Sequence, residues 1–110
     1  MSRKQVIRLS GVVQGVGMRP ALCRMAKDYG LTGSVCNTAR GVELVLYGPA
    51  AVLERFRHEL PRRIPETARL DGMECSEEWE SAFAPEDFTI RDSDAALPAA
   101  NLAVLPDAAP

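Results

Sequence analysis

A glycine-punctuated stretch, Val13–Gly17, separates two segments with different periodicities. Before it, Gln5–Gly11 alternates apolar and polar side chains, which is typical of a half-buried β-strand. After it, Arg19–Tyr29 places apolar side chains at the i, i+3, i+4 and i+7 positions of a helix with one buried face, and Gly30 suits the end of that helix. The chain therefore passes from strand to helix through a loop that the glycines keep out of regular structure.

A similar alternation of strands and helices follows. Gly33–Asn37 is a short candidate strand, a turn is expected at residues 38–41, and Val42–Tyr47 alternates clearly as a strand. Pro49 suits the first turn of a second helix, whose apolar stripe is Val52, Leu53, Phe56 and Leu60.

Prolines and shorter alternating runs mark the remaining elements. We expect Pro61 and Pro65 to end the second helix. Leu70–Cys75 and Phe88–Arg91 are shorter candidate strands, and the acidic segment Glu77–Pro85 between them is expected to be a loop.

This order of elements predicts an α+β fold of the ferredoxin-like, split βαβ type (βαββαβ), an antiparallel sheet with two helices on one face. Right-handed crossovers make the first two strands parallel and place the third between them. The loop before Arg19 and the side chain of Asn37 are then expected at the same end of the sheet, about 10 Å apart.

Size and composition restrict the class of protein. A chain of 110 residues predicts one domain, here residues 1–91, followed by an Ala/Pro-rich linker or tail at residues 92–110 that leads toward a further domain. A net charge of −2 argues against nucleic-acid partners. No apolar run reaches the length of about 20 residues that crosses a bilayer, so we expect no membrane partner and a cytoplasmic location.

The residues Gly15 and Gly17 make the loop a candidate anion site. Glycines allow successive N–H groups to point inward, and the following helix N-terminus adds unpaired donors and a favourable dipole. Arg19 can grip two phosphate oxygens with its planar fork. The spacing of the glycines alone is equally consistent with a tight strand-to-helix turn in which Arg19 faces solvent.

The second candidate is Asn37, at the end of the second strand. Its amide offers one acceptor and two donors and can hold a water molecule in place. An asparagine that simply initiates the turn at Thr38 is the alternative, and the topology that aims Asn37 at the loop favours a functional role.

The segment Gly11–Arg19 resembles the signature Gly-x-Val-Gln-Gly-Val-x-Phe-Arg of the acylphosphatase family, and Asn37–Gly41 resembles its second motif, Asn-x-x-x-Gly. Ala68–Asp71 and Phe88–Arg91 are also similar to the family, so the resemblance spans residues 5–91. It implies hydrolysis of an acyl phosphate without a cofactor or metal, with Arg19 and Asn37 as catalytic residues. The phosphate-binding residues implied are Gln14, Gly15, Val16, Gly17, Met18 and Arg19. Met18 departs from the family, which has an aromatic residue there, so the fit of the ligand is expected to differ.

A narrower resemblance rests on Arg19-Pro20, on Val35–Asn37 and on Val104–Ala109, which are similar to the N-terminal part of the HypF carbamoyltransferases that mature [NiFe] hydrogenases. It implies carbamoyl phosphate as the substrate, downstream domains of a parent chain as partners, and a maturation protein that accepts the carbamoyl group. A non-catalytic ferredoxin-like module that binds phosphate or senses a ligand is the alternative.

Overall fold

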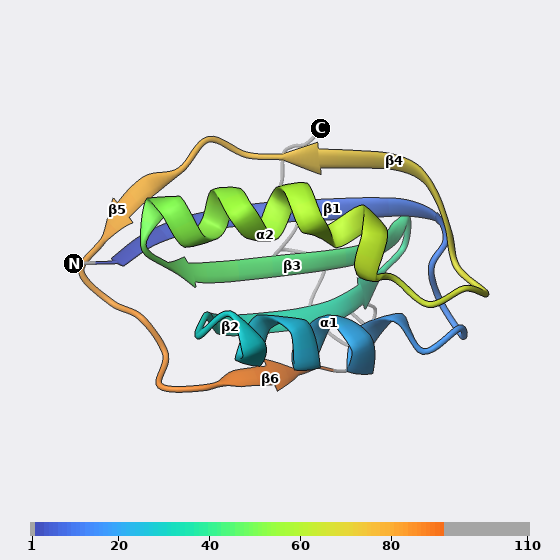
Figure 1. Ribbon diagram of the computed structural model, residues 1–110, viewed down its shortest axis with the longest axis horizontal. Coiled ribbons are helices and arrows are strands. Elements are labelled where there is room, and N and C mark those ends of the chain that lie inside the picture. The colour runs from blue at the N-terminus through green and yellow to red at the C-terminus, as the bar shows by residue number, and fades with distance from the viewer. Residues whose placement is uncertain (1, 92–110) are drawn as a thin grey trace.

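The computed structural model describes residues 2–91, and its two helices pack on a six-stranded sheet (Figure 1). In chain order the elements are β1 (Ser2–Val12), α1 (Met18–Asp28), β2 (Thr32–Thr38), β3 (Gly41–Gly48), α2 (Ala50–Arg63), β4 (Arg69–Cys75), β5 (Trp79–Ser81) and β6 (Phe88–Ile90). The predicted linker or tail at residues 92–110 lies outside the described residues.

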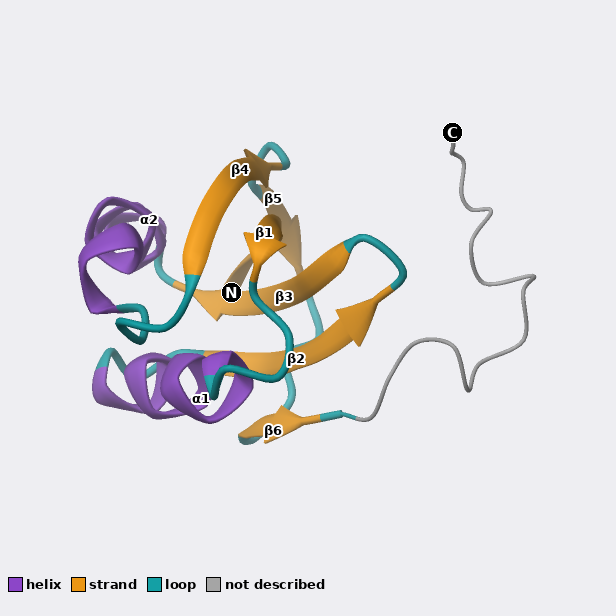
Figure 2. Cartoon of the chain, turned by 90° about the vertical axis from the view of Figure 1, so that its right-hand side faces the viewer, coloured by secondary structure: helices purple, strands orange, loops and turns teal. Residues whose placement is uncertain are grey.

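The sheet has the strand order β4-β1-β3-β2-β6, and β5 pairs with the beginning of β1. Strands β1 and β2 each pair with β3 in the antiparallel sense, so they run parallel to each other with β3 between them. Both helices cover the same face of the sheet (Figure 2). The predicted ferredoxin-like fold and its crossover geometry are therefore confirmed.

One pair of strands departs from the predicted antiparallel sheet, because β6 runs parallel to β2. After β5 the chain returns along one end of the sheet and begins β6 at the end where β2 begins (Figure 1). A strand that enters from that end can add to the free edge of β2 only in the same direction.

The core lies between the helices and the sheet. It includes the fully buried side chains of Ile7, Leu9, Leu22, Val35, Leu44, Leu46, Leu53, Phe56 and Leu60. The predicted apolar stripes of both helices contribute to it, which confirms the helical period read from the sequence. Tyr29, which caps the end of α1, packs edge-on against Phe56 of α2 with ring centroids 5.6 Å apart. The core thereby fixes the position of α1 and of the loop that precedes it.

Two local expectations are wrong. Pro61 does not end α2, which runs on to Arg63, because a proline in the last turn costs only one hydrogen bond and Leu60 stays fully buried. The helix stops before its C-cap residue Ile64, which is extended as expected for a residue before proline. Within the predicted acidic loop, Trp79–Ser81 forms β5, because the beginning of β1 offers it a free edge.

Among residues 2–91, neither helix combines the length and apolar character that a membrane span requires.

Candidate active site

The loop at residues 13–17 joins β1 to α1 and presents unpaired hydrogen-bond donors. Gly15 and Gly17 have φ values of 75° and 81°, in the left-handed region that side chains disfavour. Gly17 is the N-cap of α1, where no side chain caps the helix and no acidic residue lies in the first turn. Within residues 2–91, the N–H groups of residues 15–19 find no hydrogen-bond acceptor. The positive end of the helix dipole therefore faces an open site.

Arg19 stands in the first turn of α1 with its side chain half-buried. Its Nη1 donates a hydrogen bond of 2.9 Å to the main-chain carbonyl of Arg91, just after β6. Among the described residues, no carboxylate forms an ion pair with Arg19. The guanidinium is thus held in place while its charge stays available for an anion.

Asn37 is the penultimate residue of β2 and pairs with Val42 of β3. Because side chains alternate along a strand, Asn37 lies on the same face as the fully buried Val35, which is the face that the helices cover. Its side chain is half-buried, and its amide has no hydrogen-bond partner among residues 2–91. Such an amide is free to hold a water or a ligand.

The loop, Arg19 and Asn37 meet in one pocket of about 230 Å³. Its lining residues are Val13, Gly15, Gly17, Met18, Arg19, Pro20 and Asn37. The prediction that the crossover geometry brings Arg19 and Asn37 to the same end of the sheet is confirmed. The roles of Arg19 and Asn37 in binding and catalysis stay predictions, because the pocket shows where these side chains lie and not what they do.

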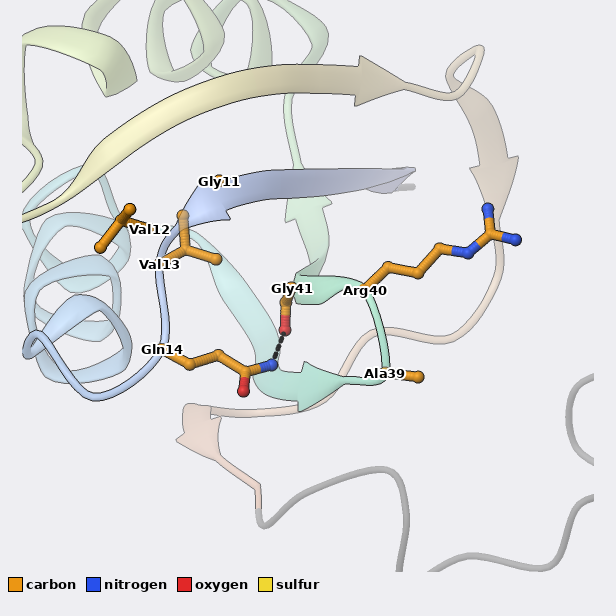
Figure 3. A pocket seen from close by; sticks show the side chains of 7 residues that line it. All are labelled: Gly11, Val12, Val13, Gln14, Ala39, Arg40 and Gly41. Atoms are coloured by element: carbon orange, nitrogen blue, oxygen red, sulfur yellow. Dashed lines mark hydrogen bonds between the residues drawn. The ribbon is translucent and has the colours of Figure 1, made fainter.

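The side chain of Gln14 turns away from this pocket. Its Nε2 donates hydrogen bonds of 2.7 Å to the carbonyls of both Thr38 and Gly41, at the two ends of the turn between β2 and β3. Figure 3 shows this amide reaching the turn in a neighbouring hollow of about 250 Å³. Both donors of the amide are therefore used on the protein itself, and only the main chain of Gln14 is left for the predicted role in phosphate binding.

Two other residues that are predicted to bind phosphate can offer it main-chain groups only. The side chain of Met18 is 1% exposed and belongs to the core, so the departure from the aromatic residue of the family signature falls in the core. The side chain of Val16 packs against the core, while its carbonyl accepts a hydrogen bond of 3.3 Å from the Thr67 hydroxyl. Both N–H groups belong to the unpaired set at residues 15–19.

No pattern in the sequence indicates that Thr67 or the Arg91 carbonyl is part of this site. Each contact joins a residue of the loop or of α1 to a main-chain or hydroxyl group distant in sequence, so no local spacing signals it. Within the described part of the chain, no three His, Cys, Asp or Glu side chains gather as a metal site would require. The absence of a metal in catalysis stays a prediction.

A model of the acylphosphatase family matches residues 5–90. The chain belongs to the acylphosphatase family. The match covers both motifs that line the pocket, the loop at residues 13–17 and Asn37, together with both helices and all of the strands except the first three residues of β1.

Individual relatives agree with this assignment. The carbamoyltransferase HypF2 of Cupriavidus necator is 44% identical over 108 residues, covering 92% of this chain and 13% of the relative. An acylphosphatase of Photorhabdus laumondii is 44% identical over 67 residues, covering 60% of this chain and 73% of the relative. A crystal structure of full-length HypF in a phosphate- and nucleotide-bound form superposes with a TM-score of 0.76 at 29% identity, covering 86% of this chain and 12% of that one.

These coverages differ between the two groups of relatives. The chain corresponds to most of the acylphosphatase but spans only about an eighth of the HypF relatives. It is therefore related to a domain within those larger carbamoyltransferases.

Proposed function

We propose that this domain hydrolyses a small acyl phosphate. The observation that carries the proposal is the pocket in which the left-handed loop, the guanidinium of Arg19 and the unpaired amide of Asn37 meet. The N–H groups of residues 15–19 and Arg19 would bind the phosphoryl oxygens. A dianion fits there because it supplies the acceptors that these donors lack, and it lies at the positive end of α1.

Asn37 is proposed to position the attacking water on the opposite side of the phosphorus. The oxygen of the water forms a bond to phosphorus while the bond from phosphorus to the acyl oxygen breaks. The acyl group leaves as a carboxylate, and the proton of the water passes to phosphate or to solvent. Of the described residues that line the pocket, only Arg19 is ionisable, so no general base is available there. Catalysis then depends on positioning and charge stabilisation, which suffices for a good leaving group.

The likeness to HypF carbamoyltransferases supports a more specific proposal. Carbamoyl phosphate would be the natural substrate, and hydrolysis would release carbamate for further domains of a parent protein in [NiFe]-hydrogenase maturation. A carbamoyl-accepting maturation protein would be the final partner, and the cytoplasm would be the location. The 44% identity over nearly the whole chain to HypF2 supports this assignment.

The competing function is a non-catalytic sensor that binds phosphate without turnover. The lack of an ionisable base among the described lining residues favours it. Binding and turnover measured on the same variants separate the two functions.

The test compares Arg19→Ala and Asn37→Ala with Arg24→Ala, which removes an exposed arginine from the same helix. We expect Arg19→Ala to weaken phosphate binding at least about tenfold, because it removes charge-assisted hydrogen bonds. We expect Asn37→Ala to retain binding and to lose turnover by about 100-fold, the scale seen when one positioned polar group is removed from a reacting centre. Arg24→Ala should resemble the wild type in both measurements.

Acetyl phosphate and carbamoyl phosphate are the assay substrates, and phosphate affinity is measured by calorimetry. Hydrolysis in ¹⁸O-labelled water should place the label in phosphate, because attack is at phosphorus. Wild-type turnover by the Arg19→Ala protein would refute the enzyme proposal. Tight phosphate binding with no turnover of either substrate by the wild type would favour the sensor.

A further inference from the structure

Residue 91 connects the two halves of the candidate site through its main chain. Its N–H donates a hydrogen bond of 2.8 Å to the carbonyl of Val35 on β2, two residues before Asn37. Its carbonyl accepts the 2.9 Å hydrogen bond from Nη1 of Arg19. One peptide segment at the end of β6 therefore bridges the strand that carries Asn37 and the guanidinium that is proposed to bind phosphate.

The chemistry of this acceptor suits a binding site. A carboxylate beside Arg19 would hold it equally well, but its charge would compete with an incoming anion. A main-chain carbonyl is neutral, so it orients the guanidinium while the positive charge remains. Because a guanidinium has five N–H donors, one hydrogen bond to Arg91 leaves enough of them for two phosphate oxygens.

Strand β6 is anchored firmly enough to act as such a support. Phe88 is 2% exposed in the core, and the main-chain carbonyl of Asp87 accepts a hydrogen bond of 3.1 Å from the N–H of Gly33. The Cys23 thiol of α1 lies 3.8 Å from the carbonyl of Phe88. The strand thus contacts both β2 and α1, although it lies outside the βαββαβ unit that defines the fold.

We propose that the main chain of residue 91 is a positioning group for Arg19, and that β6 sets the spacing between Arg19 and Asn37. The inference rests on the proposed phosphate site. It adds that phosphate binding and the docking of the end of β6 are thermodynamically coupled. Because such coupling is reciprocal, an anion in the pocket tightens the attachment of residue 91 to β2 by the same factor that this attachment contributes to anion affinity.

The test compares Arg91→Pro with Arg91→Ala. Both variants lose the side-chain charge, but only proline also removes the N–H that holds the end of β6 to Val35. The substitution lies at the exposed end of an edge strand, where proline is tolerated. We expect the phosphate dissociation constant of Arg91→Pro to exceed that of Arg91→Ala by about fivefold, the scale of one neutral main-chain hydrogen bond.

Hydrogen exchange of the unaltered protein provides a second measurement that needs no variant. Saturating phosphate should slow exchange of the Arg91 N–H by about fivefold, as reciprocity requires. The N–H of Gly33, bonded at the other end of β6, should change less and serves as the control.

Equal phosphate affinities of the two variants would overturn the positioning role, as would an unchanged Arg91 exchange rate in saturating phosphate. Failure of the wild type to bind phosphate at all would instead refute the proposed function on which the inference rests.

Discussion

Alanine in place of Gly17 tests whether the left-handed turn ahead of α1 shapes the anion site. Gly17 has a φ of 81°, and an added Cβ would meet no atom within 4 Å. The substitution therefore introduces backbone strain without a steric clash. A residue with a Cβ in the left-handed region costs about 1–2 kcal/mol, which corresponds to a factor of about 5–30 in an equilibrium constant.

Gly30, just after α1, provides a matched control. Its φ is 72°, and an added Cβ there would also meet no atom within 4 Å. Its conformation is held by hydrogen bonds from Gly30 N–H to the Lys27 carbonyl and from Leu31 N–H to the Ala26 carbonyl, and the Leu31 side chain is 2% exposed. Because this turn cannot relax, the whole cost of Gly30→Ala should fall on the free energy of unfolding and lower Tm by about 5–15 °C.

The loop at Gly17 is held less tightly: the carbonyls of Gly17 and Val16 accept hydrogen bonds from the Ala21 N–H and the Thr67 hydroxyl, but the loop's N–H groups from residue 15 onward lack partners among residues 2–91. In the free Gly17→Ala protein, the backbone of residue 17 can therefore leave the left-handed region and relieve the strain. Phosphate binding requires the left-handed conformation again, so the strain then lowers the affinity. We therefore expect Gly17→Ala to weaken phosphate binding by about 5–30-fold with a smaller loss of Tm than Gly30→Ala. Calorimetric titration and thermal unfolding by circular dichroism measure both quantities. An unchanged phosphate affinity for Gly17→Ala, or an equal loss of phosphate affinity for Gly30→Ala, would show that the turn at Gly17 does not shape the anion site.

Two further predictions concern Gln14 and Cys75. Replacing Gln14 with leucine removes both hydrogen bonds to the β2–β3 turn, so the free energy of unfolding in urea should fall by about 1–2 kcal/mol, and turnover should fall more than phosphate affinity. A loss of phosphate affinity at unchanged stability would mean that Gln14 contacts the ligand directly. Burial raises the pKa of the Cys75 thiol, and the positive charge of Arg57 opposes this shift, so Arg57→Met should raise the pKa further. Alkylation of Cys75 by iodoacetamide at pH 8, followed by peptide mass spectrometry, should then be slower, and faster alkylation would contradict the opposing effect of Arg57.

The sequence was informative where local pattern and topology agree. The strand and helix periods placed the two helices and the central strands, and the handedness of the crossovers placed the loop and Asn37 at one end of the sheet. The placement of the loop and Asn37 depends only on the order of the helices and strands, so errors of a few residues in the predicted ends of these elements do not change it. The short strand β5 and the parallel sense of β6 depend on which sheet edges are free, which no local pattern records.

The details of the site depend on long-range hydrogen bonds and were not predictable in this way. The sequence placed Gln14 among the phosphate-binding residues, because it stands inside the loop motif. Its side chain instead bonds to a turn more than twenty residues away, and Arg19 bonds to a carbonyl at a sequence separation of 72. Main-chain acceptors have no residue type that identifies them, so only the folded arrangement reveals them.

A phosphate titration followed by ¹⁵N NMR tests the anion site most directly. We predict that the N–H signals of residues 15–19 shift together on one saturating curve. Arg19→Ala should move this curve to higher phosphate concentrations, whereas Arg24→Ala should leave it unchanged. Shifts confined to the arginines of α2, or signals of the loop that stay fixed as phosphate saturates, would contradict it.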